Sequence, residues 1–133
     1  MRSILLVLLS SILLINLSCS FGKQPYTPSV PVSQIPRIEA PSSIKDTLTG
    51  GSKQYIVYAR AQQDLGVSLQ PDDFSVRFTV IDMQTGEAVG GKRLDGKPDE
   101  GTTGIAAIVP STGDYLITVF GESKPFTLTC TVK

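Results

Sequence analysis

The chain has 133 residues, in which 12 Lys and Arg are balanced by 12 Asp and Glu, with two cysteines and no histidine. The scattered, balanced charge argues against a nucleic-acid partner, which would need a basic stripe or patch. The lack of histidine removes the commonest general base and the commonest zinc or copper ligand. We therefore expect no enzyme, no cofactor and no metal site.

Residues 1–20 are typical of a secretory signal. Arg2 precedes a nearly unbroken apolar run from Ile4 to Ile15, and the small residues Ser18-Cys19-Ser20 follow it. The run is shorter than the roughly 20 residues that a membrane-spanning helix needs. This order predicts that the mature protein lies outside the cytoplasm.

The end of the signal allows two processing outcomes. Leu17-Ser18-Cys19 resembles the end of a bacterial lipoprotein cleavage box, although Asn16 stands where that box usually has Leu. We expect a lipoprotein-type signal peptide over 1–19, with Cys19 lipidated and anchoring the protein to the membrane of the bacterial cell envelope. Ordinary cleavage after Ser20 is the alternative, because Ser18 and Ser20 fit the small-x-small rule.

Residues 20–43 are predicted to form a proline-rich spacer. Five of the nine prolines lie here, at positions 25, 28, 31, 36 and 41. Proline lacks a backbone donor and fixes φ, which disfavours helix interiors and central strands. The spacer is either a semi-rigid tether between a lipid anchor and a domain or a tail of no selected length.

Residues 44–133 are predicted to form one all-β domain. Apolar residues alternate with polar ones, and turn residues separate the runs, whereas no window has helical periodicity with caps. This pattern predicts strands with one buried face, in a sandwich or barrel. Cys130 lies on the apolar side of the last run and has no partner after processing, so we expect a buried, reduced thiol. The clearest runs are 55–59, 65–69, 76–80, 115–119 and 126–132.

The stretch from Gly90 to Gly104 is a long, polar, glycine-rich loop. Asp95, Asp99 and Glu100 are candidate calcium ligands, because calcium prefers hard oxygen ligands. Asp72-Asp73 is a weaker candidate elsewhere. Neither spacing matches a defined calcium loop, so solvated loop acids are the favoured interpretation.

The region from Asp46 to Val132 resembles the bacterial pre-peptidase C-terminal (PPC-type) domain family. Residues 61–64 depart from the family, which often has a glycine turn there. The resemblance implies a single jelly-roll-like antiparallel β-sandwich that serves as an accessory or freestanding envelope domain without catalysing a reaction. The matching motifs, in chain order, are Tyr55–Ala59 followed by Leu65–Leu69, then Phe78–Asp82 with Thr85-Gly86, then Pro110–Val119 as "p-x-x-G-x-Y-x-l-x-v", and Phe126–Val132 as "Y-x-L-x-v" with Phe126 replacing Tyr.

The chain is also similar in size, secretion and strand layout to periplasmic inhibitors of g-type lysozyme. Lysozyme inhibitors often present a Ser-Gly-x-Tyr-like loop to the enzyme's cleft, and this resemblance implies a partner-binding turn formed by Ser111, Thr112, Gly113, Asp114 and Tyr115. A structural interpretation is open beside it. In that case Gly113 supplies a conformation that other residues resist, Tyr115 begins a strand on the core face, and Ser111 and Asp114 are exposed side chains of little consequence for stability.

Taken together, the sequence predicts a non-catalytic, secreted or lipid-anchored envelope protein that binds or assists a protein or cell-wall polysaccharide partner. The alternative is an inhibitor of a cell-wall lytic enzyme such as g-type lysozyme.

Overall fold

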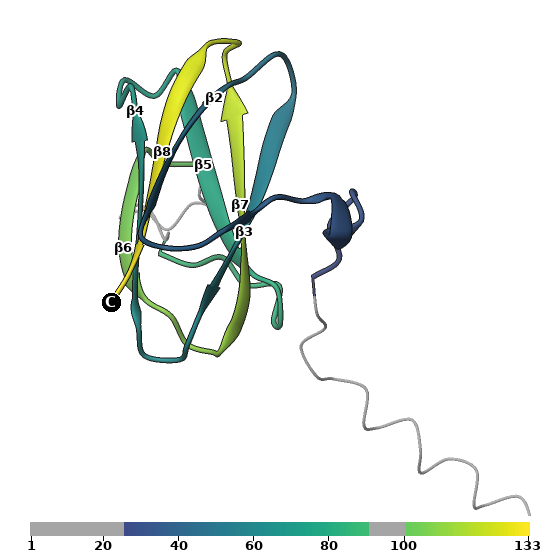
Figure 1. The fold of residues 1–133 in the computed structure, drawn as a ribbon, viewed down its shortest axis with the longest axis vertical. Helices are drawn as coiled ribbons and strands as arrows, with labels where there is room; N and C mark the ends of the chain where they lie inside the picture. Colours follow the sequence, from purple (N-terminus) through teal and green to yellow (C-terminus); the bar gives the residue numbers. More distant parts are fainter. Residues whose placement is uncertain (1–25, 91–100) are drawn as a thin grey trace, which may run out of the picture.

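The structure is a computed structural model that describes residues 26–90 and 101–133 and places two four-stranded sheets face to face (Figure 1). One sheet has the strand order β1-β3-β7-β5 and the other β2-β8-β4-β6, so the predicted all-β sandwich is confirmed. A short 3-10 helix, η3 (Val32–Gln34), precedes the strands. The strands are β1 (Arg37–Ile38), β2 (Ser42–Thr47), β3 (Ser52–Ala59), β4 (Asp64–Gln70), β5 (Val76–Asp82), β6 (Gly104–Ile108), β7 (Gly113–Gly121) and β8 (Pro125–Val132).

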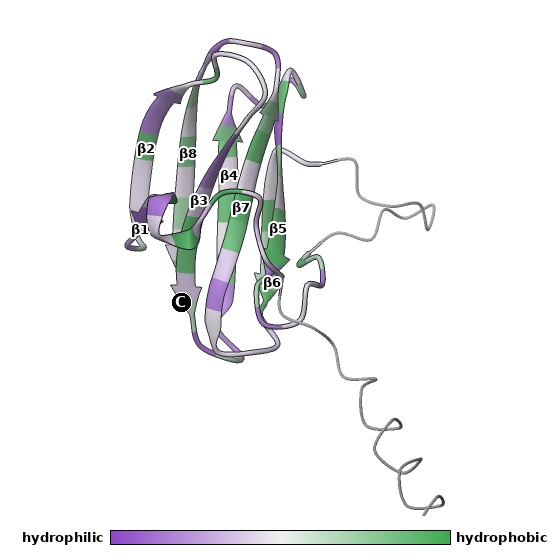
Figure 2. Cartoon of the chain, turned by 90° about the vertical axis from the view of Figure 1, so that its right-hand side faces the viewer, coloured by the Kyte–Doolittle hydropathy of each residue, from purple (hydrophilic) through white to green (hydrophobic). Residues whose placement is uncertain are grey.

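The core lies between the two sheets and is made by alternate residues of the predicted runs. Phe78, Tyr115 and Leu128 are almost completely buried there, and apolar residues recur in green along β5, β7 and β8 in Figure 2. Cys130 is also fully buried and is a free thiol, as predicted. Burial of such side chains is the main source of stability in a domain of this size.

Strands β3 and β7 are buried on both faces, so the expectation of one buried face is wrong for them. Ile56 of β3 and Leu116 of β7 point away from the core yet are fully buried. Ile35, with Tyr26 and Met83, packs over them. The segment that includes η3 therefore covers the outside of this sheet (Figure 1).

The sandwich begins before the boundary predicted at residue 44. Strand β2 starts at Ser42, and β1 pairs in parallel with β3 inside the expected spacer. Ile35 and Ile38 are buried, and the carbonyl of Pro36 accepts a hydrogen bond from Ile56 N at 2.9 Å. The prolines flank these short strands rather than interrupt them, which is where strands tolerate proline.

The sandwich has two ends that differ in their loops. Strands β5 and β7 are antiparallel, with Asp82 beside Tyr115 at one end and Val76 beside Gly121 at the other. We call the first the Tyr115 end; it carries the loops 60–63 and 109–112. The second is the Phe74 end, with the loops 48–51, 71–75 and 122–124 (Figure 1).

Candidate functional site

The predicted partner-binding turn follows β6 and leads into β7 at the Tyr115 end. Val109, just before it, is fully buried, and Gly113 pairs with Ala59 of β3. Thr112 is exposed, and its Oγ1 accepts a hydrogen bond from Ala61 N at 2.9 Å. The turn is thus attached to the neighbouring β3–β4 loop.

A buried carboxylate lies beneath this turn. Asp82, the last residue of β5, has no exposed surface. Its Oδ2 accepts a hydrogen bond from Ser111 Oγ at 2.5 Å, and its Oδ1 accepts one from Gln84 N at 2.9 Å. Buried charged groups are tolerated only when such donors surround them. Ser111 is therefore committed to Asp82 and is not the free turn side chain that was expected.

Gln84 joins the two sides of this network. With its amide oriented by its neighbours, the nitrogen donates to Asp82 Oδ1 at 2.7 Å and the oxygen accepts from Asp114 N at 3.1 Å. A Cβ atom at position 113 would lie 2.3 Å from the Gln84 amide, and Gly113 has φ of +150°. The backbone angle favours glycine here, in agreement with the structural interpretation, and a side chain would also displace the Gln84 amide from its network.

Tyr115 points into the core, as the structural interpretation predicted. Its ring is fully buried, and its hydroxyl donates to the carbonyl oxygen of Ser111. A tyrosine near the start of a strand that bonds to backbone a few residues upstream is known as a tyrosine corner in β-sandwiches. The Tyr115 side chain is thus part of the fold and is not presented to solvent.

Asp114 connects the turn to the N-terminal part of the sandwich. It forms a two-pronged ion pair with Arg37 of β1, with distances of 2.9 and 2.8 Å between guanidinium nitrogens and carboxylate oxygens. The hydrogen bond and the charge of Asp114 raise the pKa of Arg37 above its ordinary value. Because Arg37 is 56% exposed, this pair contributes little to stability.

The five predicted residues do come together, but three partners of the turn were missed. Asp82 lies 29 residues upstream of Ser111, which it binds, whereas Gln84 and Arg37 lie 30 and 77 residues upstream of Asp114. Only Asp82 had a sequence signal, as the "d" of the PPC-type hairpin motif. Nothing in its spacing indicated that Ser111 would be its donor.

A second polar cluster lies at the Phe74 end. Asp46 of β2 pairs with Lys53 Nζ at 2.7 Å, and its other oxygen accepts from Tyr55 OH at 2.6 Å. Hydrogen bonds from Lys53, then Tyr55 and the amide of Thr47, lower the pKa of Asp46 to about 2. Burial, followed by the bond to Asp46, raises the pKa of Tyr55.

This cluster borders a cleft of about 340 Å³ between the η3 segment and β3. Efficient general acid–base catalysis needs a group whose pKa lies near the working pH. The pKa values of Asp46 and Tyr55 are instead displaced in opposite directions, away from neutrality. The hydrogen bonds from Lys53 and Tyr55 of β3 to Asp46 of β2 instead join the two sheets. Ser29, Val30, Gln34, Ile35, Asp46 and Tyr55 are among the lining residues.

The remaining predicted site residues are Cys19 and the candidate calcium ligands. Cys19, Asp95, Asp99 and Glu100 lie outside the described residues. Asp73 accepts hydrogen bonds from Ser75 rather than joining a ligand set. Within 26–90 and 101–133, no group of three or more His, Cys, Asp or Glu side chains could hold a metal ion. No helix in those ranges is long and apolar enough to cross a membrane.

No family model matches the chain, and no curated protein matches it by sequence. Solved structures do resemble it. The periplasmic inhibitor of g-type lysozyme from Aeromonas hydrophila has a TM-score of 0.55 at 19% identity, covering 74% of this chain and 96% of the inhibitor. The inhibitor from Salmonella Typhimurium has a TM-score of 0.55 at 14% identity, covering 74% of this chain and 97% of its own.

The pre-peptidase C-terminal domain of a collagenase from Bacillus anthracis also resembles the chain, with a TM-score of 0.45 at 19% identity, covering 75% of this chain and 95% of that domain. The resemblance to periplasmic inhibitors of g-type lysozyme that the sequence predicted is thus found among solved structures. At these identities, the likeness to the two inhibitors shows a shared fold.

Proposed function

We propose that this chain is a non-catalytic, extracytoplasmic binding protein whose partner is another protein. The observation that carries the proposal is that an exposed turn at each end of the sandwich is held in place by hydrogen bonds. Buried Asp82 binds the turn that exposes Thr112, whereas Asp73 and Lys124 bind Ser75 in the turn that exposes Phe74. A surface loop that is already ordered loses little conformational entropy when it binds. A rigid scaffold with pre-ordered loops is well suited to recognition.

The comparisons support the same class of role. The two inhibitors described above are named as periplasmic proteins that act on an enzyme, and the similarity extends over 96% and 97% of their lengths. Because one fold hosts many functions, the fold supports a protein partner outside the cytoplasm without naming it.

Inhibition of a cell-wall lytic enzyme, such as g-type lysozyme, is the second candidate function. In this case the turn Ser111–Tyr115 would enter the enzyme's cleft. Thr112 and the turn backbone would make the contacts, because Ser111 and Tyr115 are engaged within the sandwich. The names of the similar inhibitors favour this candidate.

Titration of g-type lysozyme with the mature chain tests both functions, with binding measured by calorimetry and lysis measured on a cell-wall suspension. Binding together with inhibition supports the inhibitor, whereas binding without inhibition supports a binding protein of another kind. Absence of inhibition at micromolar concentration removes the inhibitor candidate. Co-sedimentation with purified peptidoglycan, without binding to protein, would contradict a protein partner.

The membrane anchor is a separate proposal, and it depends on Cys19. Cells that produce the wild-type chain or Cys19→Ser would be labelled with a palmitate analogue. We expect label on the wild type alone. Equal absence of label from both would contradict lipidation and leave ordinary cleavage after Ser20.

A further inference from the structure

Phe74, in the turn between β4 and β5, has an unusual conformation for its residue type. Its side chain is 61% exposed, and its φ is +65°. A positive φ is rare outside glycine, asparagine and aspartate and is an outlier for a bulky residue. Of the described phenylalanines, Phe78 and Phe126 are buried and Phe120 is partly covered. Phe74 therefore combines an exposed aromatic ring with an unfavourable backbone.

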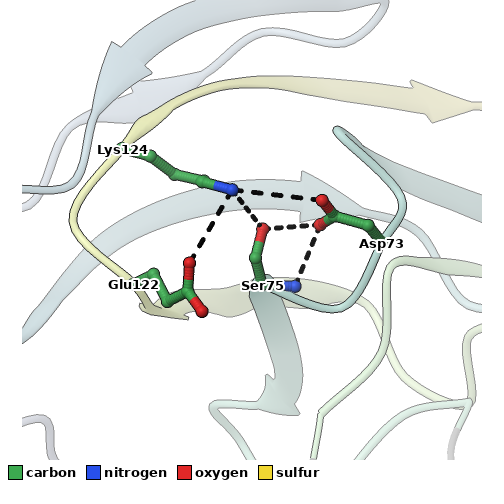
Figure 3. Close-up of polar contacts among 4 residues, drawn as sticks. All are labelled: Asp73, Ser75, Glu122 and Lys124. Carbon is green, nitrogen blue, oxygen red and sulfur yellow. Dashed lines mark hydrogen bonds and ion pairs between the residues drawn. The ribbon is translucent and has the colours of Figure 1, made fainter.

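A network of polar contacts holds the residues on either side of Phe74 (Figure 3). Asp73 Oδ1 accepts hydrogen bonds from Ser75 N at 3.0 Å and from Ser75 Oγ at 2.5 Å. Lys124 Nζ donates to Ser75 Oγ at 2.9 Å and faces Asp73 at 3.9 Å and Glu122 at 3.8 Å. The turn is thus fixed by side chains that flank Phe74 on the surface.

The loop between β7 and β8 supports the turn from the other side. Glu122 N donates to the carbonyl oxygen of Ser75 at 2.8 Å. Gly121 has φ of +132°, and a Cβ atom there would lie 2.3 Å from that same oxygen. The two loops are in close backbone contact, so the direction in which Phe74 projects is set by the fold.

We propose that Phe74 is the anchor through which this sandwich docks onto its protein partner, filling an apolar pocket rimmed by basic side chains. Aromatic side chains are enriched among the few residues that dominate binding energy. Phe74 follows Asp72 and Asp73 directly, and the network beside it adds the carboxylate of Glu122 and the ammonium of Lys124, so a basic rim is complementary. This inference rests on the proposed function, because it requires a protein partner.

Strain at an exposed position is explained by such a role. Unfavourable backbone conformations persist where the surroundings enforce them, and they cluster at functional sites. A turn whose backbone is already held in place also loses little entropy on docking. The Tyr115 end has a second non-glycine residue at positive φ, Gln62 at +73°, which supplies a matched control without an aromatic ring.

The test is site-specific photo-crosslinking with the mature chain. A photoreactive phenylalanine, p-benzoyl-phenylalanine, replaces Phe74 in one sample and the exposed residues Tyr58 or Ile108 in two control samples. Each sample is irradiated with purified g-type lysozyme and, separately, with the envelope fraction of the producing cells. We expect a discrete protein adduct from position 74 and none from positions 58 and 108.

Competition then separates docking from mere proximity. Excess wild-type chain without the photoreactive residue should compete for the partner and suppress the adduct, and the Gln62→Asn chain should do the same. The Phe74→Asn chain should be at least tenfold less effective as a competitor. Asparagine tolerates positive φ, and melting curves establish that the variants are folded. Phe74→Gly serves as the second variant if Phe74→Asn is poorly folded.

Four results would overturn the inference. Tyr58 and Ile108 lie at the Tyr115 end, so an adduct from position 58 or 108 but not 74 would leave a protein partner in place and move its surface to that end. Equal suppression by Phe74→Asn, or an adduct of twice the chain's own mass, would exclude Phe74 as the anchor for a protein partner. An absence of adducts from all three positions with both sources would count against both this inference and the proposed function.

Discussion

At the Tyr115 end, a buried carboxylate holds the turn from inside the sandwich, whereas at the Phe74 end an exposed carboxylate and a lysine hold the turn from outside. Asp82 has no exposed surface, while the side chain of Asp73 is 57% exposed. The buried network draws Ser111 and Tyr115 inward. The surface network leaves the ring of Phe74 in solvent.

With the docking role proposed for Phe74, this difference assigns stability to one end and recognition to the other. Removing one partner of a buried polar group leaves the other without a hydrogen bond and costs the full desolvation penalty, whereas exposed ion pairs contribute little. The Tyr115 end is therefore where substitutions should unfold the protein. The Phe74 end is where substitutions should change binding and spare the fold.

The largest effect is expected from Asp82→Ala. The change leaves the Ser111 hydroxyl and the Gln84 amide without their acceptor beneath the turn. We expect the free energy of unfolding to fall by about 3 kcal/mol or more. Denaturant unfolding of both chains, fitted with one shared dependence of the unfolding free energy on denaturant concentration, measures this loss. A loss below about 1 kcal/mol would show that the buried network does not stabilise this end.

Ser111→Ala is expected to follow, with a loss of about 2–3 kcal/mol, because it leaves Asp82 Oδ2 buried without its donor. The sequence alone predicted almost no effect for this substitution, so the result separates the two descriptions of Ser111. Ser68→Ala, at an exposed position of β4, is the control and should change stability by under about 0.5 kcal/mol. Similar small losses for both variants would support the description from sequence.

Cys130→Ser tests the core between the sheets, for comparison with the stability losses at the two ends. The new hydroxyl would lie in an apolar core, so a loss of about 1–3 kcal/mol is expected. Burial also raises the pKa of the Cys130 thiol to about 11, so the folded protein should react slowly with a thiol reagent at pH 8. Rapid reaction, complete before unfolding, would contradict the buried position.

The smallest effect concerns acid stability at the Phe74 end. The folded pKa of Asp46 is lowered to about 2 from an ordinary value of 3.8, so its contribution is present above pH 3.8 and lost as the pH falls toward 2. Asp46→Asn should flatten the fall in stability within this window and leave the remaining pH dependence unchanged. Acid titrations followed by circular dichroism compare the two chains. If the two chains lose stability equally as the pH falls through this window, Asp46 makes no net contribution to stability.

The sequence predicted the strands that have a clear polar and apolar alternation and missed those that do not. Strand β2 has only Ile44 as an apolar residue, and β1 is two residues long between prolines. Strand β6 follows a long polar loop, and its apolar residues lie on both faces instead of alternating with polar ones. Such edge strands depend on pairing with neighbours rather than on a local pattern.

The location of the candidate turn could be predicted from the sequence, but the hydrogen-bond partners of its residues could not. The motif around Gly113 and Tyr115 located the turn, and the glycine and the buried tyrosine behave as the structural interpretation requires. The role of Asp82 and the exposure of Phe74 depend on which distant loops the fold brings together, which a local pattern does not contain. Gln62 shows the same limit, because nothing in its local sequence indicated a φ of +73°.

The division between the two ends is tested most directly by melting Ser111→Ala and Phe74→Asn beside the wild type. A loss of 1 kcal/mol lowers Tm by roughly 4–8 °C in a domain of this size. We predict that Ser111→Ala lowers Tm by roughly 10 °C or more, while Phe74→Asn leaves Tm unchanged or raises it by a few degrees, because asparagine tolerates the positive φ. An unchanged Tm for Ser111→Ala together with a clear drop for Phe74→Asn would contradict the account.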